Sequence, residues 1–184
     1  MMRPVFALTA VLLTGVLSGC EKSAAGPAPA AEPAGTAHRG APERRSGWWE
    51  FTSKTDAGRS LGTQGLCVSK DTEARFSAFD QITQDQLLGY KCSRADFKPA
   101  ASGWTFDTAC DTGISADLGG GVVTSKGTIT GDLHTQYEIR MAVTQAGETN
   151  KGTVTAAWKG ACPAGHKPGD LAVDGTTTLN VLQN

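Results

Sequence analysis

Five cysteines carry the most definite chemistry in this chain, because a thiol can be acylated, oxidised to a disulfide, bound to zinc or used as a nucleophile. Cys20 stands directly after small residues that end a short apolar run near the N-terminus. The other four cysteines have no two members at the close spacing of a zinc-binding pair, so we expect no metal site. They are Cys67, Cys92, Cys110 and Cys162.

The N-terminus predicts a lipoprotein signal peptide over residues 1–19. Arg3 supplies the positive charge, and the apolar stretch that follows is shorter than the roughly 20 residues that a helix needs to cross a bilayer. The letters Leu-Ser-Gly-Cys that end at Cys20 resemble the bacterial lipobox, which implies cleavage before Cys20 and a lipid on its thiol. An ordinary secretory signal with a stray cysteine is the alternative. Glu21 is not the aspartate associated with inner-membrane retention, so we expect a lipid anchor in the outer membrane, facing the periplasm.

Residues 20–45 predict a disordered tether, rich in Ala, Pro and Gly. Its prolines exclude a regular helix, and it has too few apolar residues to form a core. Arg44 and Arg45 at its end are basic enough to touch anionic head groups but too few to form a polybasic patch. Residues 46–184 are then long enough for one domain with its own core.

The charge balance argues against nucleic acid as a partner. The chain has 17 Lys and Arg against 18 Asp and Glu, a formal net charge of −1. Nucleic-acid binding needs clustered basic residues, which this sequence lacks. The partners that remain are the membrane, through the N-terminal lipid anchor, and an unknown envelope protein.

Period-two alternation of apolar and polar residues predicts that residues 46–184 are mainly β. Short glycine-containing connections such as 147–152 can join only antiparallel neighbours. We expect a single antiparallel meander sheet of about seven or eight strands, strongly curled or barrel-like, with a two-sheet sandwich as the alternative. The alternating runs are 104–107, 137–144, 153–158 and 178–181.

One or two short helices are expected after the second strand, lying across the sheet. Ser69 stands before residues 70–76, whose acidic residues come first, as in a capped helix. The run 83–86, Thr-Gln-Asp-Gln, predicts a weak capping box before Leu87 and Leu88.

Four cysteines in an exported domain predict two disulfides, with three possible connectivities. Cys92 and Cys110 flank a hairpin whose turn is 99–103, and a symmetric register about residue 101 pairs them directly. The same register places Arg94, rather than Phe97, on the face of Trp104, so a bulge is expected between the cysteines and the turn.

The second disulfide, Cys67–Cys162, follows by elimination. It would close a loop of about 96 residues, which the chain-entropy model values at about 4 kcal/mol.

Several short motifs follow one another in a defined order along the domain. They are Gly47-Trp48-Trp49-Glu50-Phe51, Leu66-Cys67-Val68 with the acidic segment 69–74, the cysteine-flanked hairpin 90–110, the run 127–132, and Gly160-Ala161-Cys162-Pro163. In this order they resemble a bacterial envelope domain-of-unknown-function family (number 3617), which implies an exported envelope protein without an assigned activity. The chain differs from the family pattern in continuing past Cys162, where residues 171–183 are expected to add one more hairpin.

No residue pattern indicates catalysis, so we expect a non-enzymatic protein without a cofactor. A nucleophile needs a histidine held by a third group, and the domain has only His134, on a polar strand face, and His166, in a loop. Both are expected to be structural or solvated. The triple glycine 119–121 lacks the Lys-Ser/Thr that follows in a phosphate-binding loop.

Trp48 and Trp49 have opposite parity, which places one ring in the core and the other outside or in a groove. They are the candidate contacts for a ligand or partner, with a partly buried aromatic at a sheet edge as the alternative.

These features predict a non-catalytic envelope lipoprotein whose tethered β domain binds a partner or supports the envelope. A lipocalin-like carrier of a small apolar ligand is the alternative. The size of the inward side chains favours a filled core over a cavity. The bulky members of this set are Trp104, Phe106, Tyr137, Met141 and Trp158.

Overall fold

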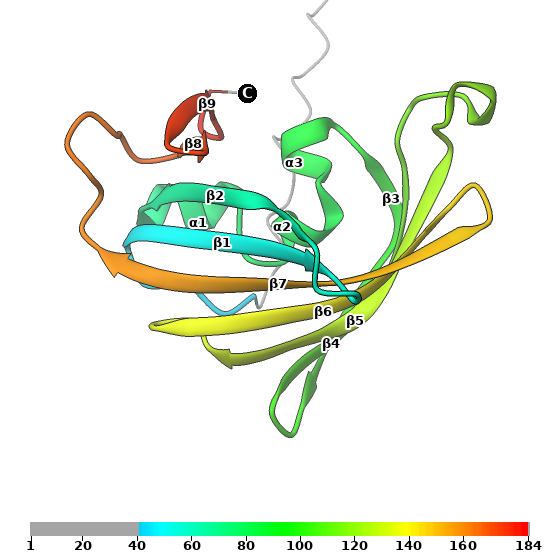
Figure 1. Ribbon diagram of the computed structural model, residues 1–184, viewed down its shortest axis with the longest axis horizontal. Coiled ribbons are helices and arrows are strands. Elements are labelled where there is room, and N and C mark those ends of the chain that lie inside the picture. Colours follow the sequence, from blue (N-terminus) through cyan, green and yellow to red (C-terminus); the bar gives the residue numbers. More distant parts are fainter. Residues whose placement is uncertain (1–40, 184) are drawn as a thin grey trace, which may run out of the picture. The chain divides into compact units, whose positions relative to one another are not determined.

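The computed structural model describes residues 41–183 of the chain. The signal peptide, the lipidated Cys20 and most of the tether that the sequence predicts lie outside these residues. Residues 41–183 form nine strands, three short α-helices and one 3-10 helix (Figure 1), and none of the helices is long and apolar enough to span a membrane. In chain order the elements are β1 (Gly47–Thr55), β2 (Ser60–Val68), α1 (Lys70–Arg75), α2 (Asp80–Thr83), α3 (Asp85–Leu88), β3 (Lys91–Ala100), β4 (Gly103–Asp111), η1 (Ala116–Leu118), β5 (Val122–Asp132), β6 (Gln136–Gln145), β7 (Glu148–Gly160), β8 (Asp170–Val173) and β9 (Thr176–Asn180).

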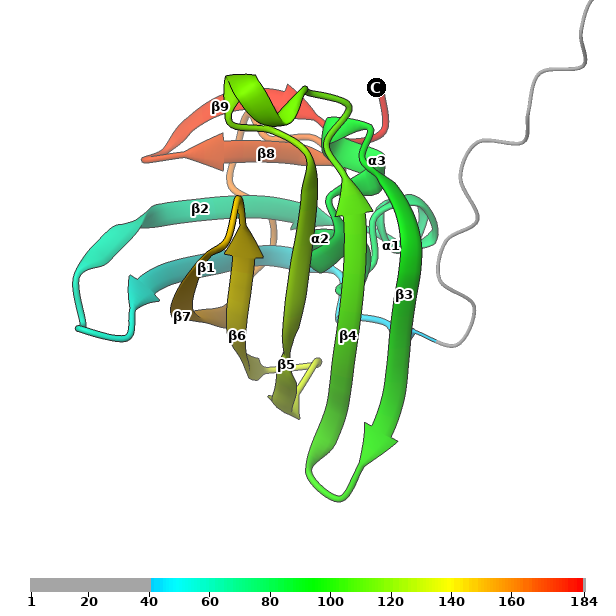
Figure 2. The same cartoon turned by 90° about the vertical axis from the view of Figure 1, so that its right-hand side faces the viewer.

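All nine strands belong to one antiparallel sheet, in the order β3-β4-β5-β6-β7-β1-β2-β8-β9 (Figure 2). Strands β3 to β7 form the expected meander. The β1–β2 hairpin lies between β7 and β8, so strands far apart in the sequence complete the sheet. The C-terminal hairpin β8–β9 continues the sheet beyond β2, which confirms the extra hairpin and takes the strand number above the expected seven or eight.

The expectation of a strongly curled or barrel-like sheet is wrong, and so is the two-sheet sandwich. A barrel needs hydrogen bonds between its first and last strands, whereas β3 and β9 are the two edges of an open sheet. The helices between β2 and β3 lie against one face of the sheet (Figures 1 and 2). This face therefore buries its apolar side chains under helices rather than by closing on itself.

Short helices follow the second strand, as expected, but there are three of them rather than one or two. The hydroxyl of Ser69 accepts a hydrogen bond from the backbone N–H of Thr72 at 3.2 Å, which confirms the predicted cap of α1. The capping box over 83–86 is wrong, because Thr83 is the last residue of α2 and lacks the extended backbone that a helix-capping residue needs. Its hydroxyl donates to the Asp85 carboxylate instead, and Gln84 links α2 to α3 with φ 58°.

Both expected disulfides are present. Cys92 is bonded to Cys110, its direct partner in the β3–β4 hairpin. The register shifts between Cys92 and Arg94, which is the expected bulge, and beyond it Phe97 stands opposite Phe106. Cys67 is bonded to Cys162, so the end of β2 is joined to the segment that follows β7.

Candidate functional site

The antiparallel register brings three connections to one end of the sheet, which we call the loop end. They are the β1–β2 connection (56–59), the β4–β5 connection (112–121) and the β6–β7 connection (146–147). The β3–β4 and β5–β6 turns lie at the opposite end, the turn end. Large side chains fill the turn end and smaller side chains line the loop end, and this difference leaves the candidate site open.

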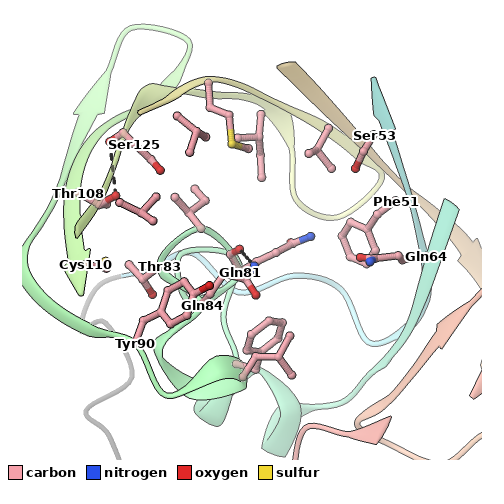
Figure 3. A pocket seen from close by; sticks show the side chains of 18 of the residues that line it. Phe51, Ser53, Gln64, Gln81, Thr83, Gln84, Tyr90, Thr108, Cys110 and Ser125 are labelled. Carbon is pink, nitrogen blue, oxygen red and sulfur yellow. Dashed lines mark hydrogen bonds between the residues drawn. The ribbon is translucent and has the colours of Figure 1, made fainter. Parts of the chain in front are cut away.

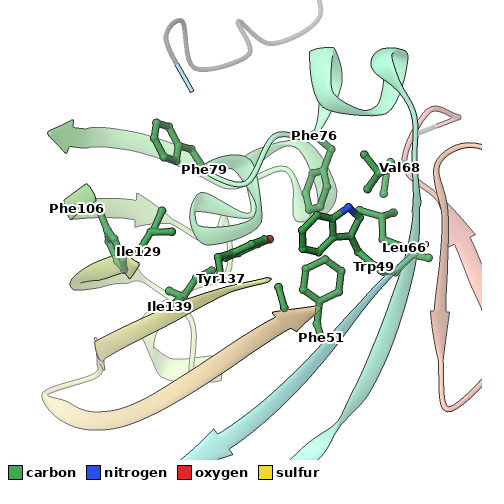
Figure 4. Packing of buried hydrophobic residues seen from close by; sticks show 13 residues of the cluster. Trp49, Phe51, Leu66, Val68, Phe76, Phe79, Phe106, Ile129, Tyr137 and Ile139 are labelled. Atoms are coloured by element: carbon green, nitrogen blue, oxygen red, sulfur yellow. The ribbon is translucent and has the colours of Figure 1, made fainter. Parts of the chain in front are cut away.

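Large buried side chains fill the space under the helices toward the turn end (Figure 4). The rings of Trp49 and Tyr137 are 5.4 Å apart, and Phe79 stacks on Phe97 at 4.0 Å. A Cβ on Gly127 would lie 2.0 Å from the backbone oxygen of Arg140 and 2.7 Å from Cζ of Phe106, so glycine is needed opposite this ring. This part of the core is packed as the bulky inward residues predicted.

Toward the loop end the same strands carry smaller side chains. On β4 the helix-covered face continues from Trp104 and Phe106 to Thr108, and Thr108 is paired directly with Ser125 on β5. The hydroxyl of Thr108 donates to the backbone oxygen of Ser125 at 3.4 Å. Two small residues therefore face each other where the turn end has aromatic rings, and the space above them stays open.

A cavity of about 310 Å³ occupies this space, between the sheet and the segment that contains α2 and α3 (Figure 3). Its lining is mainly apolar, with hydroxyl and amide groups interspersed, and none of the described residues in it carries a charge. The lining from the sheet is Phe51, Ser53, Gln64, Leu66, Thr108, Cys110, Val123, Ser125, Ile139, Met141, Val143, Val154 and Leu171. The lining from the helical segment is Phe76, Gln81, Ile82, Thr83, Gln84, Leu87 and Tyr90.

A buried ion pair stands next to the cavity. Arg44 is 3% exposed, and its Nε donates to Glu73 Oε1 at 2.6 Å while its backbone N–H donates to Oε2 at 2.9 Å. Burial raises the pKa of Glu73, and the Arg44 guanidinium acts in the opposite direction. Arg44 Nη2 also donates to the backbone oxygen of Phe76 at 2.5 Å. Each polar group of this pair therefore has a partner inside the protein, as buried charges require.

Gln81 connects the ion pair to the cavity lining. The side-chain oxygen of Gln81 accepts hydrogen bonds from Arg44 Nη1 at 3.4 Å and from the Tyr137 hydroxyl at 3.2 Å. Burial raises the pKa of Tyr137, so its hydroxyl stays protonated at neutral pH. Gln81 thus stands between a closed polar network and the open cavity.

Arg44 and Arg45 belong to the folded domain, although the sequence placed both in the tether. Arg44 is buried against α1, and Arg45 lies over the ring of Trp158, 3.7 Å from its centroid. The backbone N–H of Arg45 donates to the oxygen of Leu133 at 3.1 Å. Arg44 is therefore buried and cannot contact lipid head groups, whereas Arg45 is exposed.

Large apolar side chains remain exposed around the loop end. Leu118, in η1, is 80% exposed. Leu61 is the second residue of β2, Val122 begins β5, and Leu88 ends α3 just before β3. Ile114 lies in the β4–β5 connection as well. Exposed apolar side chains therefore lie on several elements around the loop end.

The two tryptophans singled out by the sequence lie outside the cavity lining. Trp49 is fully buried, and its indole N–H donates to the Arg45 oxygen at 2.7 Å, so it is excluded as a surface contact. Trp48 is on the opposite face, where its indole covers Gly65 and lies 4.7 Å from the His166 ring. The expected opposite parity is confirmed, but Trp48 is packed against the chain itself.

His134 and His166 have the surroundings of solvated or structural residues. His134 is exposed in the β5–β6 turn, and His166 stands in the segment that the Cys67–Cys162 disulfide fixes beside β2. Within residues 41–183 there is no group of three or more His, Cys, Asp or Glu side chains that could hold a metal ion.

Sequence reasoning missed the cavity residues and the role of Arg44. The signal for the cavity was the fall in side-chain size from Trp104 and Phe106 to Thr108 along one strand face. That signal becomes readable only when the β4–β5 register places Ser125 opposite Thr108. Arg44 has no such signal, because it follows a Pro-rich segment and has a second arginine beside it.

Comparison with known proteins places this domain in a family. A search of curated proteins and a search of solved structures found no match. The model of a family described as "Protein of unknown function (DUF3617)" matches residues 44–162, more than half of the chain, beginning at the buried Arg44 and ending at the disulfide-bonded Cys162. The chain therefore belongs to the DUF3617 family of proteins of unknown function.

Proposed function

We propose that this protein is a membrane-tethered, non-catalytic binding domain of the bacterial envelope that takes a small, uncharged and mainly apolar ligand. The observation that carries this proposal is the cavity of about 310 Å³ beneath α2 and α3, whose described lining has no charged side chain. Ligand pockets commonly have volumes of about 300–1,000 Å³ and are lined mainly by apolar side chains with a few polar groups. The cavity has this size and composition.

The cavity favours a carrier over a purely structural protein. Bulky side chains predicted a filled core, and they do fill the turn end around Trp49 and Tyr137. Met141, however, lines the open cavity at the other end. A protein that only supports the envelope has no need for such a space, because an apolar void costs stability.

The exposed apolar side chains around the loop end support the same proposal. A ligand with low solubility in water is most easily received from a membrane or from another carrier, through contacts that are themselves apolar. Leu61, Leu88 and Leu118 provide such contacts on three different elements at the end of the sheet where the cavity lies.

The non-catalytic part of the proposal rests on the chemistry of the lining. Its described residues include no histidine and no acidic or basic side chain, and Cys110 is bonded to Cys92. General acid–base and nucleophilic catalysis need such groups within reach of the substrate.

Ligand binding is tested by native mass spectrometry of the protein after gentle extraction from its own envelope. We expect a stoichiometric added mass that is lost in Ser125→Phe, because a ring at this position fills the cavity. Thr124→Phe is the matched control, since Thr124 is the neighbouring residue of β5 and points to the opposite face. A wild-type protein that carries no ligand and binds no added amphiphile would contradict the proposal.

The tether is tested separately with Cys20→Ser. If Cys20 carries the lipid anchor, the wild-type protein is recovered with membranes and the variant leaves the membrane fraction. Continued association of the variant with washed membranes would reject the anchor without affecting the ligand test.

A further inference from the structure

The orientation of the Gln81 side chain follows from its neighbours. A guanidinium group has only hydrogen-bond donors, so the atom of Gln81 that faces Arg44 Nη1 has to be the amide oxygen. The hydroxyl of Tyr137 points at the same oxygen. The usual ambiguity between the oxygen and the nitrogen of a glutamine amide is therefore absent at this position.

The amide nitrogen of Gln81 is turned away from this network. Among the described residues it has no hydrogen-bond partner, and Gln81 is one of the residues that line the cavity (Figure 3). Its two N–H groups are available to an acceptor there. A ligand that displaces water from this part of the cavity would leave these donors unpaired unless it brings an oxygen atom that accepts from them.

The charge distribution around Gln81 determines which oxygen fits. Arg44 is hydrogen-bonded to the Gln81 oxygen, but its guanidinium is already paired with the Glu73 carboxylate through Nε. No described Lys, Arg or His lines the cavity. A carboxylate would therefore lose its water without gaining an opposite charge, whereas a neutral carbonyl loses little and gains the Gln81 donors.

The rest of the lining fits a hydrocarbon chain. Ile82 follows Gln81 in α2, and Met141 and Val143 face the same space from β6. Such side chains bury apolar surface without directional requirements.

We propose that Gln81 donates a hydrogen bond to a neutral carbonyl oxygen of the ligand, so that the cavity selects uncharged acyl esters over free fatty acids. Arg44 and Tyr137 are positioning residues, because they hold the Gln81 oxygen and so aim its N–H groups at the ligand. This inference rests on the proposed function and names the class of ligand that the cavity takes.

The test compares a neutral ester with an acid of the same chain length. Monododecanoylglycerol and dodecanoate are titrated below their micelle concentrations, at pH 8, into the full chain carrying Cys20→Ser, which needs no detergent. We expect the ester to bind at least tenfold more tightly than the acid. Gln81→Leu should weaken ester binding about five- to tenfold, the effect of losing one or two neutral hydrogen bonds.

Gln136→Leu is the matched control. Gln136 is exposed at the start of β6 and is not one of the residues that line the cavity. The same substitution there should leave ester binding within twofold of wild type. Tyr137→Phe removes one of the two donors to the Gln81 oxygen without altering the lining, and it should cause a smaller loss than Gln81→Leu.

An infrared spectrum gives a readout that does not depend on whether a variant folds. The carbonyl band of ester labelled with ¹³C at its carbonyl should be shifted to lower frequency in the wild-type cavity relative to the same ester in a dry hydrocarbon solvent. An unshifted band, equal binding of ester and acid, or unchanged binding by folded Gln81→Leu would overturn this inference while leaving the cavity as a binding site. Failure of both probes to bind the wild-type protein would instead reject the proposed function.

Discussion

The guanidinium of Arg44 and the carboxylate of Glu73 form an ion pair inside the domain, with 2.6 Å between Nε and Oε1 and with 0% and 4% of the two side chains exposed. Arg44 lies just before β1, and Glu73 lies in α1. The pair therefore fixes the entry of the chain into the domain and the first of the helices that cover the sheet. Breaking the pair should lower the stability of the protein and disturb the orientation of the Gln81 side chain.

Arg44→Met is expected to destabilise the protein by about 3–5 kcal/mol, because it leaves the Glu73 carboxylate buried without its partner. Urea unfolding measures this change. The double variant Arg44→Met with Glu73→Leu should recover much of the loss, since both charges are then removed together.

Arg45→Met is the matched control, because Arg45 is exposed and its main contact is the face of the Trp158 ring. It should cost less than about 1 kcal/mol. Equal losses for the two arginines would contradict the special role of Arg44.

The two disulfides should differ in how much they stabilise the protein. Cys67 and Cys162 are 95 residues apart in the sequence, and Cys92 and Cys110 are 18 apart. Loop-closure entropy predicts a loss of about 4–5 kcal/mol when the first pair is replaced by serine and about 3 kcal/mol for the second. Urea midpoints of the two double-serine variants test the order, and a greater loss for Cys92→Ser with Cys110→Ser would show that local packing outweighs chain entropy.

Gly65 is required by the Trp48 ring that covers it. A Cβ at residue 65 would lie 1.9 Å from Trp48 Cζ2, so Gly65→Ala must displace the indole and is expected to cost about 1–3 kcal/mol. In the background of Trp48→Ala the same substitution should cost much less, because the two residues are in contact. A double-mutant cycle by urea unfolding measures this coupling, and additive losses would mean that the ring does not restrict residue 65.

Asp170 should make the C-terminal hairpin sensitive to acid. The backbone N–H of Lys167 donates to Asp170 Oδ2 at 2.7 Å, and Asn180 Nδ2 donates to Oδ1 at 2.7 Å. These hydrogen bonds, that of Lys167 first, lower the pKa of Asp170 below its ordinary value. A lowered pKa contributes stability above the unfolded-state value of about 3.9, and the contribution is lost as pH falls through the lower folded-state pKa.

Asp170→Asn is therefore expected to destabilise the protein near pH 7, and the difference from wild type should shrink below about pH 4. Thermal unfolding between pH 7 and pH 2.5 measures it, and hydrogen exchange of the β8 and β9 amides localises it. Asp174→Asn, in the exposed β8–β9 turn, is the matched control for the substitution itself. A constant difference between wild type and Asp170→Asn across this range would contradict the role assigned to the carboxylate.

The sequence by itself determined the features that depend on neighbouring residues or on one hairpin. Alternation around Tyr137 and Ile139 identified the strand and its buried face, because side chains in a strand repeat with period two. The symmetry of the β3–β4 hairpin paired Cys92 with Cys110, and the misplacement of Phe97 in that register indicated the bulge.

Only the tertiary structure decided the features that depend on contacts between distant segments. The sheet is open because its edge strands β3 and β9 do not pair, and β1 and β2 stand between β7 and β8, an arrangement that no local pattern specifies. Arg44 is buried because Glu73, 29 residues later, meets it under the sheet. The cavity and the orientation of Gln81 arise where Thr108, Ser125 and the helical segment come together, since a space between side chains exists only after the chain has folded around it.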